Sequence, residues 1–147
     1  MRNPDFYNTE GYPDPTHYFA LQNIKKEEQK RINRLHCYRP IVYICSPFKG
    51  DISTNIKNAR KYSRFAVLKG YLPITPHLLF PQFLNDADAD EREIGIYMGL
   101  VLMTKCVELW VFGDTVSEGM AREIKKAKVR GIIVRHFSKE LQEETRC

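Results

Sequence analysis

The spacing of apolar residues changes at Pro40 and divides the chain into two regions. Between residues 16 and 35, apolar side chains recur on one face among lysines and glutamates, which predicts an amphipathic helix capped by Thr16. Residues 1–19 are rich in proline and aromatic residues. They are predicted to form an irregular arm that packs on its own core or on a neighbouring subunit.

After Pro40, short continuous apolar runs alternate with helical patterns, as in strands buried on both faces and joined by helices. The predicted strands are 41–45, 71–75, 107–112 and 132–135, and the predicted helices are 56–68, 88–103 and 117–129, with a loop over 76–88. Strands that alternate with helices pair in parallel through right-handed crossovers. The predicted fold class is therefore α/β, a small doubly wound parallel sheet of order 2-1-3-4 with helices on both faces, Rossmann-like or flavodoxin-like.

This pattern predicts three parts of the chain: an N-terminal arm and helix (1–39), an α/β domain (40–137) and a charged tail (138–147). No apolar run is long enough for a membrane span, and the polar N-terminus lacks the apolar segment of a signal peptide. A cytoplasmic protein without a membrane partner is expected. The four cysteines show neither CxxC nor zinc-ligand spacing, so no metal and no cofactor is predicted.

The net charge of +5 raises the question of nucleic-acid binding. The densest basic run, between Lys125 and Arg130, lies opposite the small apolar residues Ala121 and Ala127 on a predicted helix. A solvated helix face explains this run, so a nucleic-acid partner is not favoured. An adaptor that uses this face and the aromatic arm remains a third functional hypothesis, weaker than an enzyme or a ligand-binding protein.

Topology alone places a ligand site. In open parallel sheets, ligands bind beyond the carboxyl ends of the strands, where strand order reverses. This rule predicts a cleft between the loop 46–51 and the segment that leads from Asp114 into the helix around Glu123. The loop 46–51 offers a hydroxyl, a cation and a glycine, which suit an anion, although an ordinary strand-to-helix turn is the alternative. It matches neither the dinucleotide-binding glycine motif nor a Walker loop.

Other residues at the same edge could contribute to this cleft. Ser117 can cap a helix or hold an oxyanion, and Gly119 allows a ligand to approach the backbone. Glu123 either looks into the cleft or forms a surface ion pair. Tyr43 is a core tyrosine or a site residue beneath the cleft, and His77 is a structural histidine or a cleft wall.

Three segments carry a family resemblance: 41–50 (IVYICSPFKG), 74–77 (ITPH) and 106–124 (CVELWVFGDTVSEGMAREI). They are similar to the nucleoside 2-deoxyribosyltransferase superfamily over about residues 40–136. The most similar branches are the deoxynucleoside-monophosphate N-glycosidases and an uncharacterised branch common in bacteria and their phages. The first 39 residues have no counterpart.

The resemblance implies roles for individual residues. Glu123 matches the nucleophile that attacks C1′ of the sugar, and Tyr43 matches the tyrosine that orients it. The positions that hold the 5′ end of the ligand are matched by Ser46, Lys49, Gly50 and Ser117. His77 matches a position near the base or sugar. The other expected ligand-binding residues are Pro47, Phe48, Gly119 and Met120. The ligand would be a nucleoside or nucleotide, and the protein a homodimer or larger.

One departure concerns the acid that protonates the leaving base. Where the family usually carries an aspartate at the start of the third strand, this chain has Val107. Glu108 would reach the site only through a bulge, and Asp114 is another candidate substitute. The predicted function is therefore N-glycosidic bond hydrolysis or 2-deoxyribosyl transfer. The alternative is a weak or inactive nucleotide-binding protein, a sensor or a sequestering protein.

Overall fold

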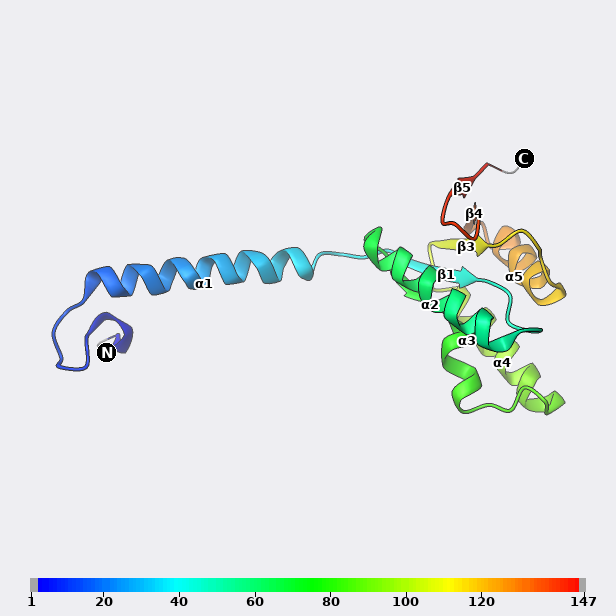
Figure 1. The fold of residues 1–147 in the computed structure, drawn as a ribbon, viewed down its shortest axis with the longest axis horizontal. Helices are drawn as coiled ribbons and strands as arrows, with labels where there is room; N and C mark the ends of the chain where they lie inside the picture. Colours follow the sequence, from blue (N-terminus) through cyan, green and yellow to red (C-terminus); the bar gives the residue numbers. More distant parts are fainter. Residues whose placement is uncertain (1–2, 146–147) are drawn as a thin grey trace. The chain divides into compact units, whose positions relative to one another are not determined.

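A five-stranded sheet of order β2-β1-β3-β4-β5 lies at the centre of the unit Arg39–Cys147 (Figure 1). The computed structural model describes residues 3–145. Its strands are β1 (Ile41–Cys45), β2 (Leu72–Ile74), β3 (Glu108–Phe112), β4 (Ile133–Phe137) and β5 (Glu143–Glu144). The first four pair in parallel, so the predicted order 2-1-3-4 is confirmed. The fifth, antiparallel to β4, lies in the predicted charged tail, and two residues are too few to show a strand pattern.

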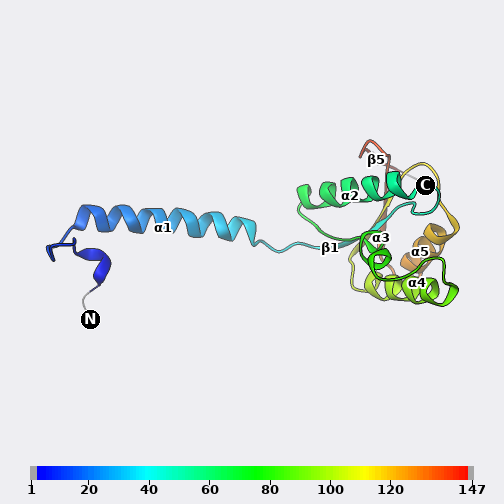
Figure 2. The ribbon, with the colours of Figure 1, turned by 60° about the horizontal axis from the view of Figure 1, so that its bottom comes forward.

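Helices cover both faces of the sheet, as predicted (Figure 2). Val42 and Ile44 of β1 belong to the core beneath α2 (Ile52–Leu68). The alternate residues Tyr43 and Cys45 belong to the core beneath α4 (Ala89–Met103) and α5 (Glu118–Val129). Successive strand residues point to opposite faces, so each half of this alternating pattern forms its own core. The fold is therefore a doubly wound, Rossmann-like α/β sheet.

Two segments differ from prediction, one through a helix cap and the other through short helices within a predicted loop. α2 begins at Ile52, earlier than residue 56, because the side chain of Asp51 accepts a hydrogen bond from the Thr54 N–H (3.1 Å). The predicted loop 76–88 contains the short helices α3 (Pro76–Leu79) and η2 (Phe80–Gln82). Helices of one turn have too few residues for a periodic pattern.

The unit Met1–Tyr38 consists of η1 (Pro4–Phe6) and α1 (Pro15–Leu35). The N-cap of α1 is Asp14, which accepts from the His17 N–H at 3.0 Å, so the predicted cap at Thr16 is wrong. Proline favours the first helical position, which moves the helix start to Pro15. Within this unit, the arm packs on α1 through an edge-to-face contact between Phe6 and Tyr18 at 5.3 Å.

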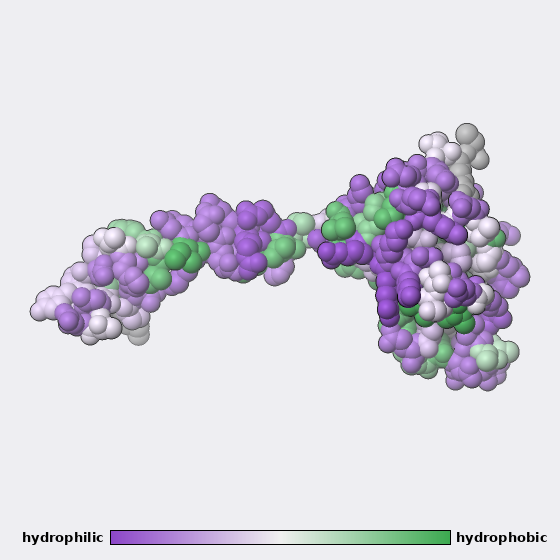
Figure 3. All heavy atoms as spheres, viewed as in Figure 1, coloured by the Kyte–Doolittle hydropathy of each residue, from purple (hydrophilic) through white to green (hydrophobic). Residues whose placement is uncertain are grey.

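Hydrophilic residues dominate the surface seen in Figure 3, with separate hydrophobic areas between them. Across residues 3–145, no helix is both long enough and apolar enough to cross a membrane.

Candidate active site

A cavity of about 350 Å³ lies at the carboxyl end of β1, between the loop 46–51 and the helices α3, α4 and α5. The site residues expected from the sequence that line it are Tyr43, Ser46, Pro47, Phe48, Lys49, His77, Ser117, Gly119, Met120 and Glu123. They come from three segments that are distant in sequence. The parallel order of the sheet brings these segments to one edge.

Tyr43 and Glu123 form the central contact of the cavity. The Tyr43 hydroxyl donates to Oε1 of Glu123 at 2.7 Å. The Ser117 side chain caps α5 by accepting the Met120 N–H (3.2 Å), which sets where the helix begins. Glu123 follows six residues later and meets the tyrosine of β1. The other carboxyl oxygen, Oε2, is buried and accepts no hydrogen bond within residues 3–145.

The surroundings of Glu123 act on its pKa in opposing directions. Burial raises the pKa of Glu123 above its usual value, whereas the thiol of Cys45 and the hydroxyl of Tyr43 lower it. Burial and the neighbouring Glu123 charge raise the pKa of Tyr43 and of Cys45 well above their usual values. Both neighbours therefore stay protonated at neutral pH and stabilise a carboxylate that burial disfavours.

The loop after β1 supplies groups that suit an anion. The Ser46 hydroxyl is buried and has no hydrogen-bond partner in the described part of the chain, and Lys49 lines the same cavity. Ser117 uses its oxygen as an acceptor for the helix cap, so its hydroxyl proton is available to a ligand. Gly50 is not among the cavity-lining residues. It adopts φ of +94°, a turn conformation that favours glycine.

His77 lines the cavity beside Phe48. Their rings stack with centroids 5.0 Å apart and planes 14° from parallel. Burial lowers the pKa of His77, while its hydrogen bond to the Ser46 backbone and the charge of Asp86 raise it. The imidazole is thus held in one orientation.

The far wall of the cavity was not anticipated from the sequence. It contains apolar residues around η2, Asp86 in the loop before α4, and Glu91 and Arg92 in the first turn of α4. These residues fall in or next to the predicted loop 76–88, where only the acidic helix start gave a sequence signal. Gly99 brings α4 close to β1, because a Cβ at this position would lie 3.2 Å from the Tyr43 hydroxyl oxygen.

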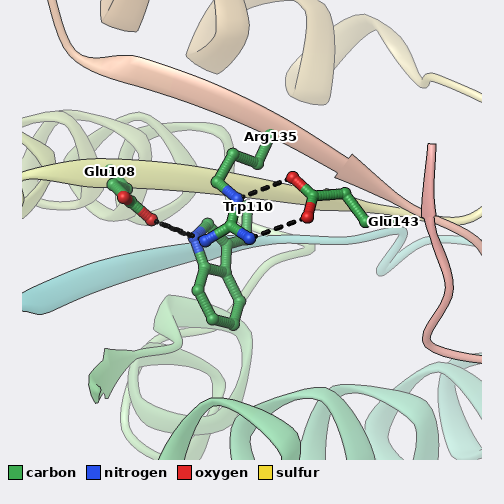
Figure 4. A network of polar contacts seen from close by, with 4 residues as sticks. All are labelled: Glu108, Trp110, Arg135 and Glu143. Atoms are coloured by element: carbon green, nitrogen blue, oxygen red, sulfur yellow. Dashed lines mark hydrogen bonds and ion pairs between the residues drawn. The ribbon is translucent and has the colours of Figure 1, made fainter. Parts of the chain in front are cut away.

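The three positions considered for the leaving-group acid are all absent from the cavity lining. Val107 is half-exposed and precedes β3, at the opposite end of the strand from the cavity. Asp114 is exposed after β3, and its charge acts on Tyr62 in the core beneath α2. Glu108 is engaged elsewhere, because its Oε2 accepts from Trp110 Nε1 at 2.6 Å (Figure 4). The β1–β3 register is regular, so no bulge turns Glu108 toward the cavity.

The sheet order and the cavity at its carboxyl edge define the class of protein, a Rossmann-like α/β domain. One solved structure of similar fold is a 2-deoxyribosyltransferase from the psychrotolerant bacterium Bacillus psychrosaccharolyticus, described as a biocatalyst for the synthesis of antiviral and antitumoral nucleosides. It is 18% identical, with a TM-score of 0.58 over 73% of this chain and 77% of that chain. At this identity, the likeness shows a shared fold.

The family model that matches this chain, over residues 40–137, is described as "Domain of unknown function (DUF7768)". The chain belongs to this family. No curated protein matches it in sequence.

Proposed function

We propose that the protein cleaves or exchanges the N-glycosidic bond of a nucleotide or deoxynucleoside, with Glu123 as the nucleophile. The observation that carries this proposal is the state of the Glu123 carboxyl at the cavity. One oxygen is fixed by Tyr43 at 2.7 Å, and the other is buried without a partner within residues 3–145. Buried polar atoms are nearly always hydrogen-bonded, so an unpaired carboxyl oxygen on a cavity-lining residue indicates a functional role.

Oε2 of Glu123 would attack C1′ while Tyr43 holds Oε1. The C1′–N bond breaks, and its electron pair leaves with the base. The product is a glycosyl ester of Glu123, which water hydrolyses or a second base displaces. Lys49, Ser46 and Ser117 would bind the 5′ end, and hydroxyl donors together with one cation favour a phosphate there.

This proposal is tested by incubating the wild-type protein and Glu123→Ala with 2′-deoxynucleosides, ribonucleosides and their 5′-monophosphates. Free base is measured by liquid chromatography, and a glycosyl adduct on the intact protein is sought by mass spectrometry. We expect base release and an adduct only with wild type. Equal release by both proteins across the panel contradicts the role of Glu123.

Binding without turnover was considered because Val107 replaces an expected acid. Position 107 does not line the cavity, so this substitution gives no reason to expect an inactive site. Calorimetry with the same nucleotides separates the two functions, because tight binding of an unchanged nucleotide would favour a binding protein. The proposed homodimer or larger oligomer is checked by light scattering, where a monomer mass contradicts it.

A further inference from the structure

Three features constrain the side chain of His77. It lies at the start of α3, its ring stacks on Phe48, and it hydrogen-bonds to the Ser46 backbone. When one ring nitrogen donates to a backbone carbonyl, the other nitrogen of neutral imidazole can only accept a proton. This second nitrogen becomes a donor only in the imidazolium form. The ring is therefore oriented to exchange one proton with a ligand in the cavity that it lines.

The cavity contains other titratable and charged side chains, contributed by every element around it. They are Tyr43 of β1, Lys49 after β1, Asp86 before α4, Glu91 and Arg92 of α4, and Glu118, Arg122 and Glu123 of α5. Of these, Asp86 is the residue whose charge acts on His77. Glu91 accepts a hydrogen bond from the backbone N–H of Asn85 and so holds the loop that carries Asp86.

We propose that His77 is the general acid and base of this site and serves the leaving base. This inference rests on the proposed function. In the first step, Glu123 forms a bond to C1′ and the C1′–N bond breaks. Its electron pair stays on the base, which takes a proton from the His77 imidazolium.

In the second step, neutral His77 takes a proton from water as the water oxygen attacks C1′. The bond between C1′ and Glu123 breaks, which restores the carboxylate and the imidazolium. The sum is one base and one sugar from one nucleotide and one water. His77 thus supplies the proton that Glu108 and Asp114 are not placed to give and that Val107 cannot give.

The pH dependence of activity follows from the surroundings of the two groups. The active form has Glu123 ionised and His77 protonated. Burial raises the pKa of Glu123 and lowers that of His77. The pH range in which Glu123 is ionised and His77 is protonated is therefore narrower than for the free side chains. We expect an activity maximum in mildly acidic solution, with the alkaline limb below the ordinary histidine value of about 6.5.

The test compares His77→Gln with wild type on two substrates, 2′-deoxyguanosine 5′-monophosphate and its 7-methyl derivative. The methylated base already carries a positive charge and leaves without protonation. Base release is followed in a single turnover, which isolates the first step. We expect its rate to fall by about 10²- to 10⁴-fold with the first substrate and by less than tenfold with the second. The alkaline limb should disappear in the variant. Equal losses on both substrates, or an unchanged alkaline limb, overturn the role of His77.

A second variant tests Asp86 without removing the imidazole. Asp86 raises the pKa of His77, so Asp86→Asn should move the alkaline limb to lower pH. Glu93→Gln removes an exposed charge from α4 outside the cavity and should leave the limb in place. Equal shifts in both variants would contradict a specific effect of the Asp86 charge on His77. If wild type releases base from neither substrate nor any member of the wider panel, the proposed function itself fails. If wild type is active and only these contrasts fail, His77 alone loses its role.

Discussion

The two faces of the sheet each hold a glutamate, and they treat it in opposite ways. Beneath α2, Glu108 accepts from Trp110 at 2.6 Å and pairs with Arg135 at 3.3 Å. Arg135 also makes two hydrogen bonds to Glu143, both 2.8 Å long (Figure 4). Beneath α4 and α5, Oε1 of Glu123 accepts from Tyr43, the Cys45 thiol lies beside the carboxyl group, and Oε2 is buried without a hydrogen-bond partner in the described chain.

This contrast separates a structural carboxylate from the proposed nucleophile. Paired charges with several donors stabilise a fold, whereas a buried acceptor without a partner costs about 1–3 kcal/mol. Packing follows the same division. The α2 face is filled by stacked aromatic rings, including Tyr62 on Phe112 at 4.2 Å, while the other face encloses the cavity. Both faces carry a buried core, but only the α4 and α5 face combines its core with a cavity and a glutamate that lacks a full set of partners.

The largest expected effect comes from exchanging each glutamate for glutamine. Glu123→Gln should lower base release by at least about 10³-fold, because an amide is not a nucleophile. Glu108→Gln should retain activity, since Glu108 lies on the other face. Steady-state assays on the most reactive substrate of the panel measure both. Comparable losses of base release in the two variants would contradict the separate roles of the two glutamates.

Stability should change in the opposite sense in these two variants. The pKa of Glu123 is raised in the folded protein, so the folded state is favoured below the unfolded pKa and loses this advantage as pH rises. Glu123→Gln should therefore stabilise by about 1 kcal/mol at pH 7 and by less at pH 4. Glu108→Gln should destabilise by about 1–2 kcal/mol, because Arg135 loses a charged partner. Urea denaturation followed by Trp110 fluorescence measures both changes.

Tyr43→Phe should have the next largest effect. The substitution removes the hydroxyl that holds Oε1. In wild type, this hydroxyl lowers the pKa of Glu123. We expect kcat to fall by about 10- to 100-fold. The pKa of Glu123 should rise further, so the acidic limb of the pH–rate profile should move to higher pH. An acidic limb that stays in place would show that the tyrosine does not act on the carboxylate.

The difference between the two faces also marks what sequence reasoning reached. The alternation of strands with helices predicted the order that places β1 beside β3. The alternation of side chains along a strand indicated that Glu108 points away from the site. The pairing of Glu108 with Arg135 brings together residues 27 positions apart, and their types alone do not reveal such a contact. The far wall of the cavity was missed because α3 and η2 are single turns that follow no period.

Gly99 offers a smaller test of how closely the reactive face must pack. A Cβ at this position lies 3.2 Å from the Tyr43 hydroxyl, so Gly99→Ala should displace that group by a few tenths of an ångström. We expect kcat to fall by about 2- to 5-fold, with an acidic limb that moves in the same direction as in Tyr43→Phe. A rate equal to wild type would contradict the contact.

Gly95→Ala is the matched comparison for stability. Alanine is favoured over glycine in a helix interior by about 1 kcal/mol at both positions. At Gly95 the added carbon meets only a Leu84 methyl group, at 3.4 Å, so the stabilisation should be retained. At Gly99 the contact with Tyr43 should offset it. Thermal unfolding of the two variants compares these gains directly.

The smallest effect is expected at the edge of the α2 face, where β5 pairs with β4. Glu143 is half-exposed, and Arg135 lowers its pKa. A carboxyl group with a lowered folded pKa stabilises the protein above its unfolded pKa and loses that contribution as pH falls through the folded value. Glu143→Gln should therefore cost about 0.5 kcal/mol at pH 7, as for an exposed ion pair, and almost nothing at pH 3. Urea denaturation at the two pH values measures this difference. A cost as large as that of Glu108→Gln would mean that the exposed partner, rather than the buried one, anchors Arg135.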